Sequence, residues 1–143
     1  MEREAEVVLV GNHEFRFVPP NQIRFYIRGV FDGPEVEAHF QWGYKYADLL
    51  GSYVDCIVDM TKFERVTDSG RQRLTRVQRP YPYHGCALLG ATFATKAIAN
   101  MVISAGKLLA PKSFAYPIKF VDTWEEAESW LAELKEKRTS ARN

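Results

Sequence analysis

The fold is decided by residues 54–70, with the sequence VDCIVDMTKFERVTDSG. The run at 54–60 is largely apolar, which is typical of a buried strand. After a short loop, the DSG turn at 68–70 carries residue types that commonly begin a helix. A basic stretch follows as far as Pro80, and we expect it to form a helix over residues 68–79. A strand, a loop and a helix in this order predict one unit of an α/β fold.

The segments on either side continue this alternation. Upstream, we expect two strands joined by a tight Gly11-Asn12 turn, then a third strand, then a helix that Asp32 caps and that reaches Gly51. These elements occupy residues 5–10, 13–18, 22–28 and 33–50. Downstream, the pattern predicts two more strand–helix pairs, at residues 85–89 with 95–109 and 115–121 with 124–134.

Strands that alternate with helices require crossover connections, whereas the N-terminal hairpin must pair antiparallel. The prediction is therefore an α/β fold with a mixed, mostly parallel β-sheet in the order β-β-β-α-β-α-β-α-β-α. Pro117 lacks a backbone donor, which indicates an edge position for the last strand.

Composition narrows the class of protein. The chain has 143 residues, 46% of them hydrophobic and 26% charged, and we expect one domain made of a hairpin (5–18), a core (22–134) and a polar tail (135–143). A formal net charge of +1 argues against a general attraction to nucleic acid, although a local patch stays open. Two cysteines, a charged N-terminal segment and no sufficiently apolar 20-residue run predict a cytoplasmic protein without a transmembrane segment.

The strand, loop and turn between Asp59 and Gly70 resemble the STAS family, the SpoIIAA-like domains of anti-sigma-factor antagonists. The ending at 120–131, FVDTWEEAESWL, is similar to that of a stand-alone bacterial branch of this family, which itself resembles lipid-transfer domains. The resemblance implies a SpoIIAA-like fold and a non-enzymatic regulatory module whose partner is a protein, such as a regulatory kinase or an anti-sigma-like factor.

Laid without gaps on the family pattern, Asp68 falls on the serine that family kinases phosphorylate, with Thr67 before it and Ser69 after it. A permanent carboxylate would then imitate part of a phosphoserine, with about one negative charge in place of nearly two. Two alternatives stay open. In the first, a shortened turn keeps Ser69 as the acceptor. In the second, Asp68 only caps the helix and has no further role.

The predicted topology brings several polar groups to the carboxyl edge of the parallel strands, where ligands of open α/β sheets collect. Residues 61–80 hold six cations and two carboxylates, which fits either an acidic partner or a solvated charged face. The candidate switch and partner-binding residues are Asp32, Asp59, Thr61, Thr67, Asp68, Ser69, Gly70, Arg71 and Thr92.

The predicted helix at 95–109 is unusually apolar, since residues 97–106 carry no charge. A surface helix normally has a charged face. Tight packing would explain this composition, and so would an apolar wall facing a second copy of the chain, a partner groove or a hydrophobic or lipid ligand. The residues expected to form that wall are Ile98, Met101, Val102 and Leu109.

Catalytic motifs are missing from the sequence. His13, His39 and His84 are scattered, no metal-binding spacing occurs, and Cys56 and Cys86 lie in apolar strands that favour inert thiols. We therefore expect no enzyme, no cofactor and no metal, and the lack of aromatic residues among the arginines argues against nucleic acid. Two hypotheses follow: a regulatory protein-interaction module, or a carrier or sensor of a small hydrophobic ligand.

Overall fold

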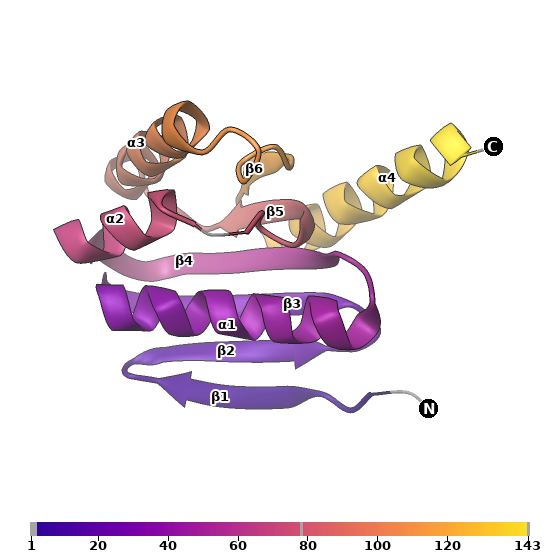
Figure 1. Cartoon of the computed structure of the whole chain (residues 1–143), viewed down its shortest axis with the longest axis horizontal. Helices are drawn as coiled ribbons and strands as arrows, with labels where there is room; N and C mark the ends of the chain where they lie inside the picture. The colour runs from indigo at the N-terminus through magenta and orange to yellow at the C-terminus, as the bar shows by residue number, and fades with distance from the viewer. Residues whose placement is uncertain (1–2, 78, 143) are drawn as a thin grey trace.

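A computed structural model describes residues 3–77 and 79–142, and its strands form one six-stranded sheet in chain order (Figure 1). The first three strands pair antiparallel, and the third to the sixth pair parallel. This mixed, mostly parallel sheet confirms the predicted fold class and element order. The strands are β1 (Glu6–Val10), β2 (His13–Val18), β3 (Gln22–Phe31), β4 (Val54–Val66), β5 (Tyr83–Leu89) and β6 (Ile118–Val121).

Four helices cover the sheet, and Figure 1 shows α1 lying across one face while α4 runs outward beyond β5. The main core lies beneath α1, whereas a small second core lies beneath α4 and consists of Ile57, Ala87, Leu89, Val121, Ala127 and Leu131. The two faces of the sheet are therefore covered by different helices. These are α1 (Gly33–Leu50), α2 (Asp68–Thr75), α3 (Phe93–Leu109) and α4 (Trp124–Arg142).

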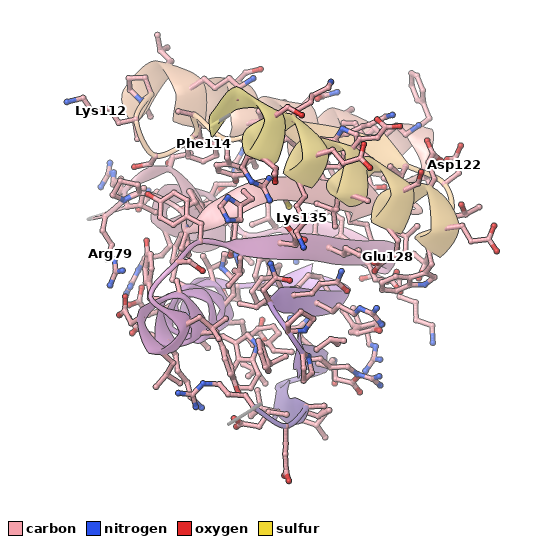
Figure 2. The ribbon with its side chains drawn as sticks, turned by 90° about the vertical axis from the view of Figure 1, so that its right-hand side faces the viewer. Arg79, Lys112, Phe114, Asp122, Glu128 and Lys135 are labelled. Atoms are coloured by element: carbon pink, nitrogen blue, oxygen red, sulfur yellow. The ribbon has the colours of Figure 1, made fainter. Side chains whose placement is uncertain are left out.

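Alternation along β2 and β3 builds the main core. Phe15 and Phe25 are buried and meet edge to face with ring centroids 5.0 Å apart. Arg24, between them in sequence, lies on the opposite face, where it packs over the Trp124 ring at 4.8 Å and pairs at 3.3 Å with Glu128. Figure 2 labels Glu128 on α4. The period of two predicted for this region thus places phenylalanine rings in the core and arginines with their partners on the opposite face.

The predicted loop after residue 60 is wrong, because β4 continues to Val66. Its last residues pair with the end of the long strand β3, with Arg28 opposite Lys62 and Phe31 opposite Val66. Pairing between β4 and β5 stops at Asp59. Residues 61–66 therefore have a neighbouring strand on one side only. Because this segment is less buried than a central strand, its sequence is polar and was mistaken for a loop.

The predicted helix at 68–79 is too long. The Thr75 hydroxyl donates back to the carbonyl of Arg71 at 2.9 Å, and Arg76 leaves the helix with φ −111° and ψ 65°. Arg79 instead contacts α1, where its guanidinium lies 4.2 Å from the Tyr44 ring centroid. Tertiary contacts with α1 thus replace the last predicted turn.

The C-terminal elements also differ from the prediction at their ends. The strand β6 begins after Pro117, whose carbonyl accepts from the Cys86 N–H at 2.9 Å, and it occupies the predicted edge. The predicted start of α4 is confirmed, because Thr123 Oγ1 accepts from the Glu126 N–H at 3.1 Å. The helix does not end at residue 134 but continues through most of the predicted polar tail, since no Gly or Pro interrupts residues 124–142.

Within residues 3–77 and 79–142, every helix is too short or too polar to span a bilayer.

Candidate functional site

The start of α2 is anchored to the start of α1. Thr67 Oγ1 accepts from the Gly70 N–H at 3.0 Å and donates to Asp32 Oδ1 at 2.6 Å. The Thr67 hydroxyl, and then the Gly33 N–H, hold the pKa of the Asp32 carboxyl below its usual value. Asp32 is therefore an ionised acceptor that fixes the cap of α2, and the expected meeting of Asp32 with the turn is confirmed.

Asp68 does not cap α2, because Thr67 does. Asp68 occupies the first helical position, its side chain is 86% exposed, and it pairs with Arg71 one turn later. A carboxylate there also faces the positive end of the helix dipole. The capping interpretation of Asp68 is thus wrong, while its correspondence to the phosphoserine of the STAS pattern stays a prediction.

Ser69 and Gly70 lie against the end of β3 and the start of α1. Ser69 is exposed, and a Cβ atom added to Gly33 would come within 2.2 Å of its Oγ. Gly70 is buried, and a Cβ there would come within 2.7 Å of the Phe31 carbonyl oxygen. The turn therefore requires glycine at position 70, where backbone approaches, and Ser69 stays on the surface.

The remaining polar candidates form separate local contacts. Asp59 Oδ1 accepts from the Thr61 N–H at 2.9 Å and from Thr61 Oγ1 at 2.7 Å, and Thr92 Oγ1 caps α3 by accepting from the Thr95 N–H at 3.2 Å. In the described part of the chain, no hydrogen bond or ion pair joins these residues to the turn around Thr67. The carboxyl edge of the parallel strands, which we predicted to form one site, thus holds three separate groups of contacts, around Thr67, Asp59 and Thr92.

The basic stretch after the turn is partly neutralised by α1. Arg73 pairs with Glu37 at 3.0 Å, and Arg79 pairs with Asp48 at 2.9 Å. Arg76 has no carboxylate partner among the described residues. Two of the six cations between residues 61 and 80 are therefore paired with carboxylates of α1, and Arg71 is paired with Asp68.

An apolar cavity of about 140 Å³, partly open to solvent, lies between α3 and the sheet. It is almost entirely apolar, and two of the four residues expected to form an apolar wall, Ile98 and Val102, line it. Met101 and Leu109 do not line it, because they are exposed and border a groove between α2 and α3. The other lining residues are Phe25, Ile27, Phe31, His39, Val58, Met60, Phe63, Val66, Leu74, Tyr81, Cys86, Leu88, Ala99, Ile103, Phe114, Tyr116 and Ile118.

His39 contributes an imidazole to this cavity, which the sequence analysis missed. Burial lowers its pKa to about 4, so the ring is neutral at pH 7. Its Nδ1 donates to the Val36 carbonyl oxygen at 3.0 Å, which leaves Nε2 as an acceptor. The sequence signal was weak, and consisted of the apolar residues Val36 and Phe40 that flank His39 on its helix.

The two cysteines are free and buried, with their Sγ atoms 3.6 Å apart on neighbouring strands. Burial raises the pKa of the Cys56 thiol, which agrees with the predicted inert character. No group of three or more His, Cys, Asp or Glu residues within residues 3–77 and 79–142 is placed to hold a metal ion.

Comparison of the sequence with protein-family models and with curated proteins gives no match. Among solved structures, an uncharacterised DUF3478-family protein from Shewanella loihica PV-4, described as having a SpoIIAA-like fold, matches with a TM-score of 0.53. The match covers 90% of this chain and 92% of the other, at 11% identity. The chain has a SpoIIAA-like fold. The anti-sigma factor antagonist SpoIIAA in its unphosphorylated form is also similar, with 15% identity, coverage of 84% and 97%, and a TM-score of 0.49.

Proposed function

We propose that this protein binds a small, neutral, apolar molecule in the cavity beneath α3, as a carrier or a sensor. The observation that carries the proposal is the cavity itself, about 140 Å³ in volume and lined by Phe25, Leu88 and Ile98 among others. An enclosed apolar cavity of roughly 150 Å³ accommodates a benzene-sized molecule, and the space beneath α3 is of similar volume. Space of this kind costs a protein stability unless something fills it.

The chemistry of the lining favours an uncharged ligand. None of the lining residues that the structure describes is a lysine, arginine, aspartate or glutamate. His39 is neutral, and burial also raises the pKa of Tyr81, whose hydroxyl is already donating to the Leu74 carbonyl at 2.7 Å. A charged ligand would lose its hydration without gaining a counterion, so a hydrocarbon-like molecule fits best.

The roof of the cavity gives a ligand a route inside. Only Thr95 and Gly106 are buried among the 17 residues of α3, so few core contacts hold this helix on the sheet. Elements with few buried contacts open locally at low free-energy cost. We therefore expect α3 to move when the ligand enters or leaves.

Native mass spectrometry of the protein freshly purified from its own host tests this proposal. A mass surplus that disappears on denaturation is the expected result, and benzene titrated into the ligand-free protein should bind with a measurable heat. Ala99→Leu adds bulk at the cavity wall and should abolish benzene binding. Ala97→Leu makes the same change on the exposed side of α3 and should leave binding intact.

Two outcomes would overturn the proposal. The first is the absence of both a dissociable adduct and a benzene heat. The second is equal loss of benzene binding in the two alanine variants, since this would place the bound benzene outside the cavity.

A second function is favoured by the turn at the start of α2: a regulatory module that a protein partner recognises. Asp68 is exposed at the first position of a helix whose cap is fixed by Thr67 and Asp32. Asp68→Lys should abolish capture of the partner from an extract of the host, whereas Asp122→Lys, between β6 and α4, should not. Unchanged capture by Asp68→Lys would exclude this surface. A phosphate that survives denaturation would instead favour Ser69 as an acceptor.

A further inference from the structure

The outward face of α3 is apolar and open to solvent. Phe93 is 93% exposed, Met101 62% and Leu108 82%. With Ala97 between the first two, these residues recur at helical spacing and share one side of α3. Exposed aromatic and aliphatic side chains gathered on one helix face mark a surface that contacts something apolar.

Cations lie beside the C-terminal half of this face, whereas its N-terminal end follows Gly90, whose N–H donates to the carbonyl of Val121, the residue before Asp122. Residues 69–117 contain seven Lys and Arg residues and no Asp or Glu, and three of these cations are paired with Asp68, Glu37 and Asp48. Arg71 and Arg76 border the groove that also contains Met101, with Asp68 as the one carboxylate in its lining. Lys107 lies in the last turn of α3, and Lys112 projects outward from the turn after it, at the end opposite Asp122 (Figure 2).

We propose that this face of α3 docks onto an anionic lipid bilayer. An exposed apolar helix face buries itself at the boundary between headgroups and acyl chains, and flanking Lys and Arg residues add attraction to anionic lipid. Their long aliphatic stems let the charged ends of Arg76, Lys107 and Lys112 reach the headgroups while the helix sinks deeper.

The same charges disfavour a second copy of this chain as the occupant. A symmetric dimer through α3 would place Arg76 and Lys107 of both protomers at one interface, where the one carboxylate lining the groove, Asp68, is already paired with Arg71. An anionic bilayer supplies both an apolar layer and the opposite charge. The inference goes beyond ligand binding and does not need it, since Phe93, Met101 and Leu108 do not line the cavity.

Vesicle flotation tests the proposal, with the full chain mixed with phosphatidylcholine vesicles with or without 30% phosphatidylserine at about 0.1 M salt. The protein should float with the anionic vesicles and stay unbound with the neutral ones. Leu108→Glu should reduce binding by more than about tenfold, because an apolar anchor is replaced by a charge that the headgroups repel. Arg76→Gln and Lys107→Gln should each reduce it about fivefold.

Two matched control variants test whether vesicle binding depends on α3 in particular. Leu9→Glu makes the same change at a 70% exposed leucine on the edge strand β1, and Lys137→Gln removes a charge from α4. Both should bind like the parent protein. Absence of binding to anionic vesicles would overturn the proposal, and so would equal loss in Leu9→Glu. Equal binding of Leu108→Glu would also overturn it, because an interaction by charge alone points to an acidic macromolecule.

Discussion

Two helices of nearly the same length, α1 and α3, are used in opposite ways. Eight of the 18 residues of α1 are buried, among them Trp42 and Tyr46, whereas α3 buries two of its 17. The residues of α3 are nevertheless largely apolar, and they surround a cavity on one side and meet solvent on the other. Apolar composition alone therefore does not show that a helix belongs to the core. What its side chains contact decides whether it stabilises the fold or stays available for binding.

Truncating one large side chain on each helix should give the largest contrast. Trp42→Ala should lower the free energy of unfolding by about 3–5 kcal/mol, because it removes a buried ring and the donor to the Arg16 carbonyl at 3.2 Å. Leu108→Ala should change it by less than about 0.5 kcal/mol. Chemical denaturation of both variants measures the difference. A cost above about 2 kcal/mol for Leu108→Ala would show that the outer face of α3 is covered in solution.

The order and type of the ten elements follow from the sequence, because hydrophobic period and turn residues are local signals. The end of β4 does not, since residues 61–66 owe their strand to the far end of β3, which is remote in sequence. The cap of α2 is similar: Thr67, Asp68 and Ser69 are all good caps, and Asp32 selects Thr67 by accepting its hydroxyl. Contacts from distant segments decide such details.

For the candidate sites too, local sequence predicts part of the result and contacts between distant segments decide the rest. The uncharged run in α3 indicated an unusual surface, and the four residues chosen there do lie at a cavity or a groove. Which of the four residues line the cavity and which border the groove could not be predicted, because this depends on the distance between α3 and the sheet. His39 escaped notice for the same reason, since a single buried histidine has no sequence signature until its neighbours are placed.

Acid should destabilise the core beneath α1 through His39. Its pKa is about 4 in the folded chain, below the ordinary 6.5, so the unfolded chain takes up a proton between pH 6.5 and 4 that the folded chain does not. The stabilising contribution is complete above pH 6.5 and is lost as the pH falls toward 4, by about 2.5 kcal/mol between pH 7 and 4.5. Denaturation of the parent and of His39→Leu across this range measures it. The same pH dependence in His39→Leu would assign the loss to other groups.

The smallest expected difference in the free energy of unfolding is between two Gly→Ala variants, one in each helix. A Cβ atom at Gly106 of α3 would come within 2.3 Å of the Phe114 ring, whereas one at Gly43 of α1 would meet Tyr83 Oη at 3.1 Å. Alanine is favoured over glycine in helices by about 1 kcal/mol, and overpacking costs about 1–3 kcal/mol. Gly106→Ala should therefore be less stable than the parent by about 1 kcal/mol, and Gly43→Ala should lie closer to it.

Comparing Gly106→Ala with Gly43→Ala also tests the cavity beneath α3. Phe114 lines it, so a ring displaced by Gly106→Ala should loosen α3 and speed hydrogen exchange of its amides, with little change in α1. Gly43→Ala should leave exchange in α3 as it is, because Gly43 lies outside the cavity lining. Stabilisation by Gly106→Ala, with slower exchange in α3, would mean that the helix stands farther from Phe114 in solution. The cavity would then be larger than 140 Å³ and open to larger ligands.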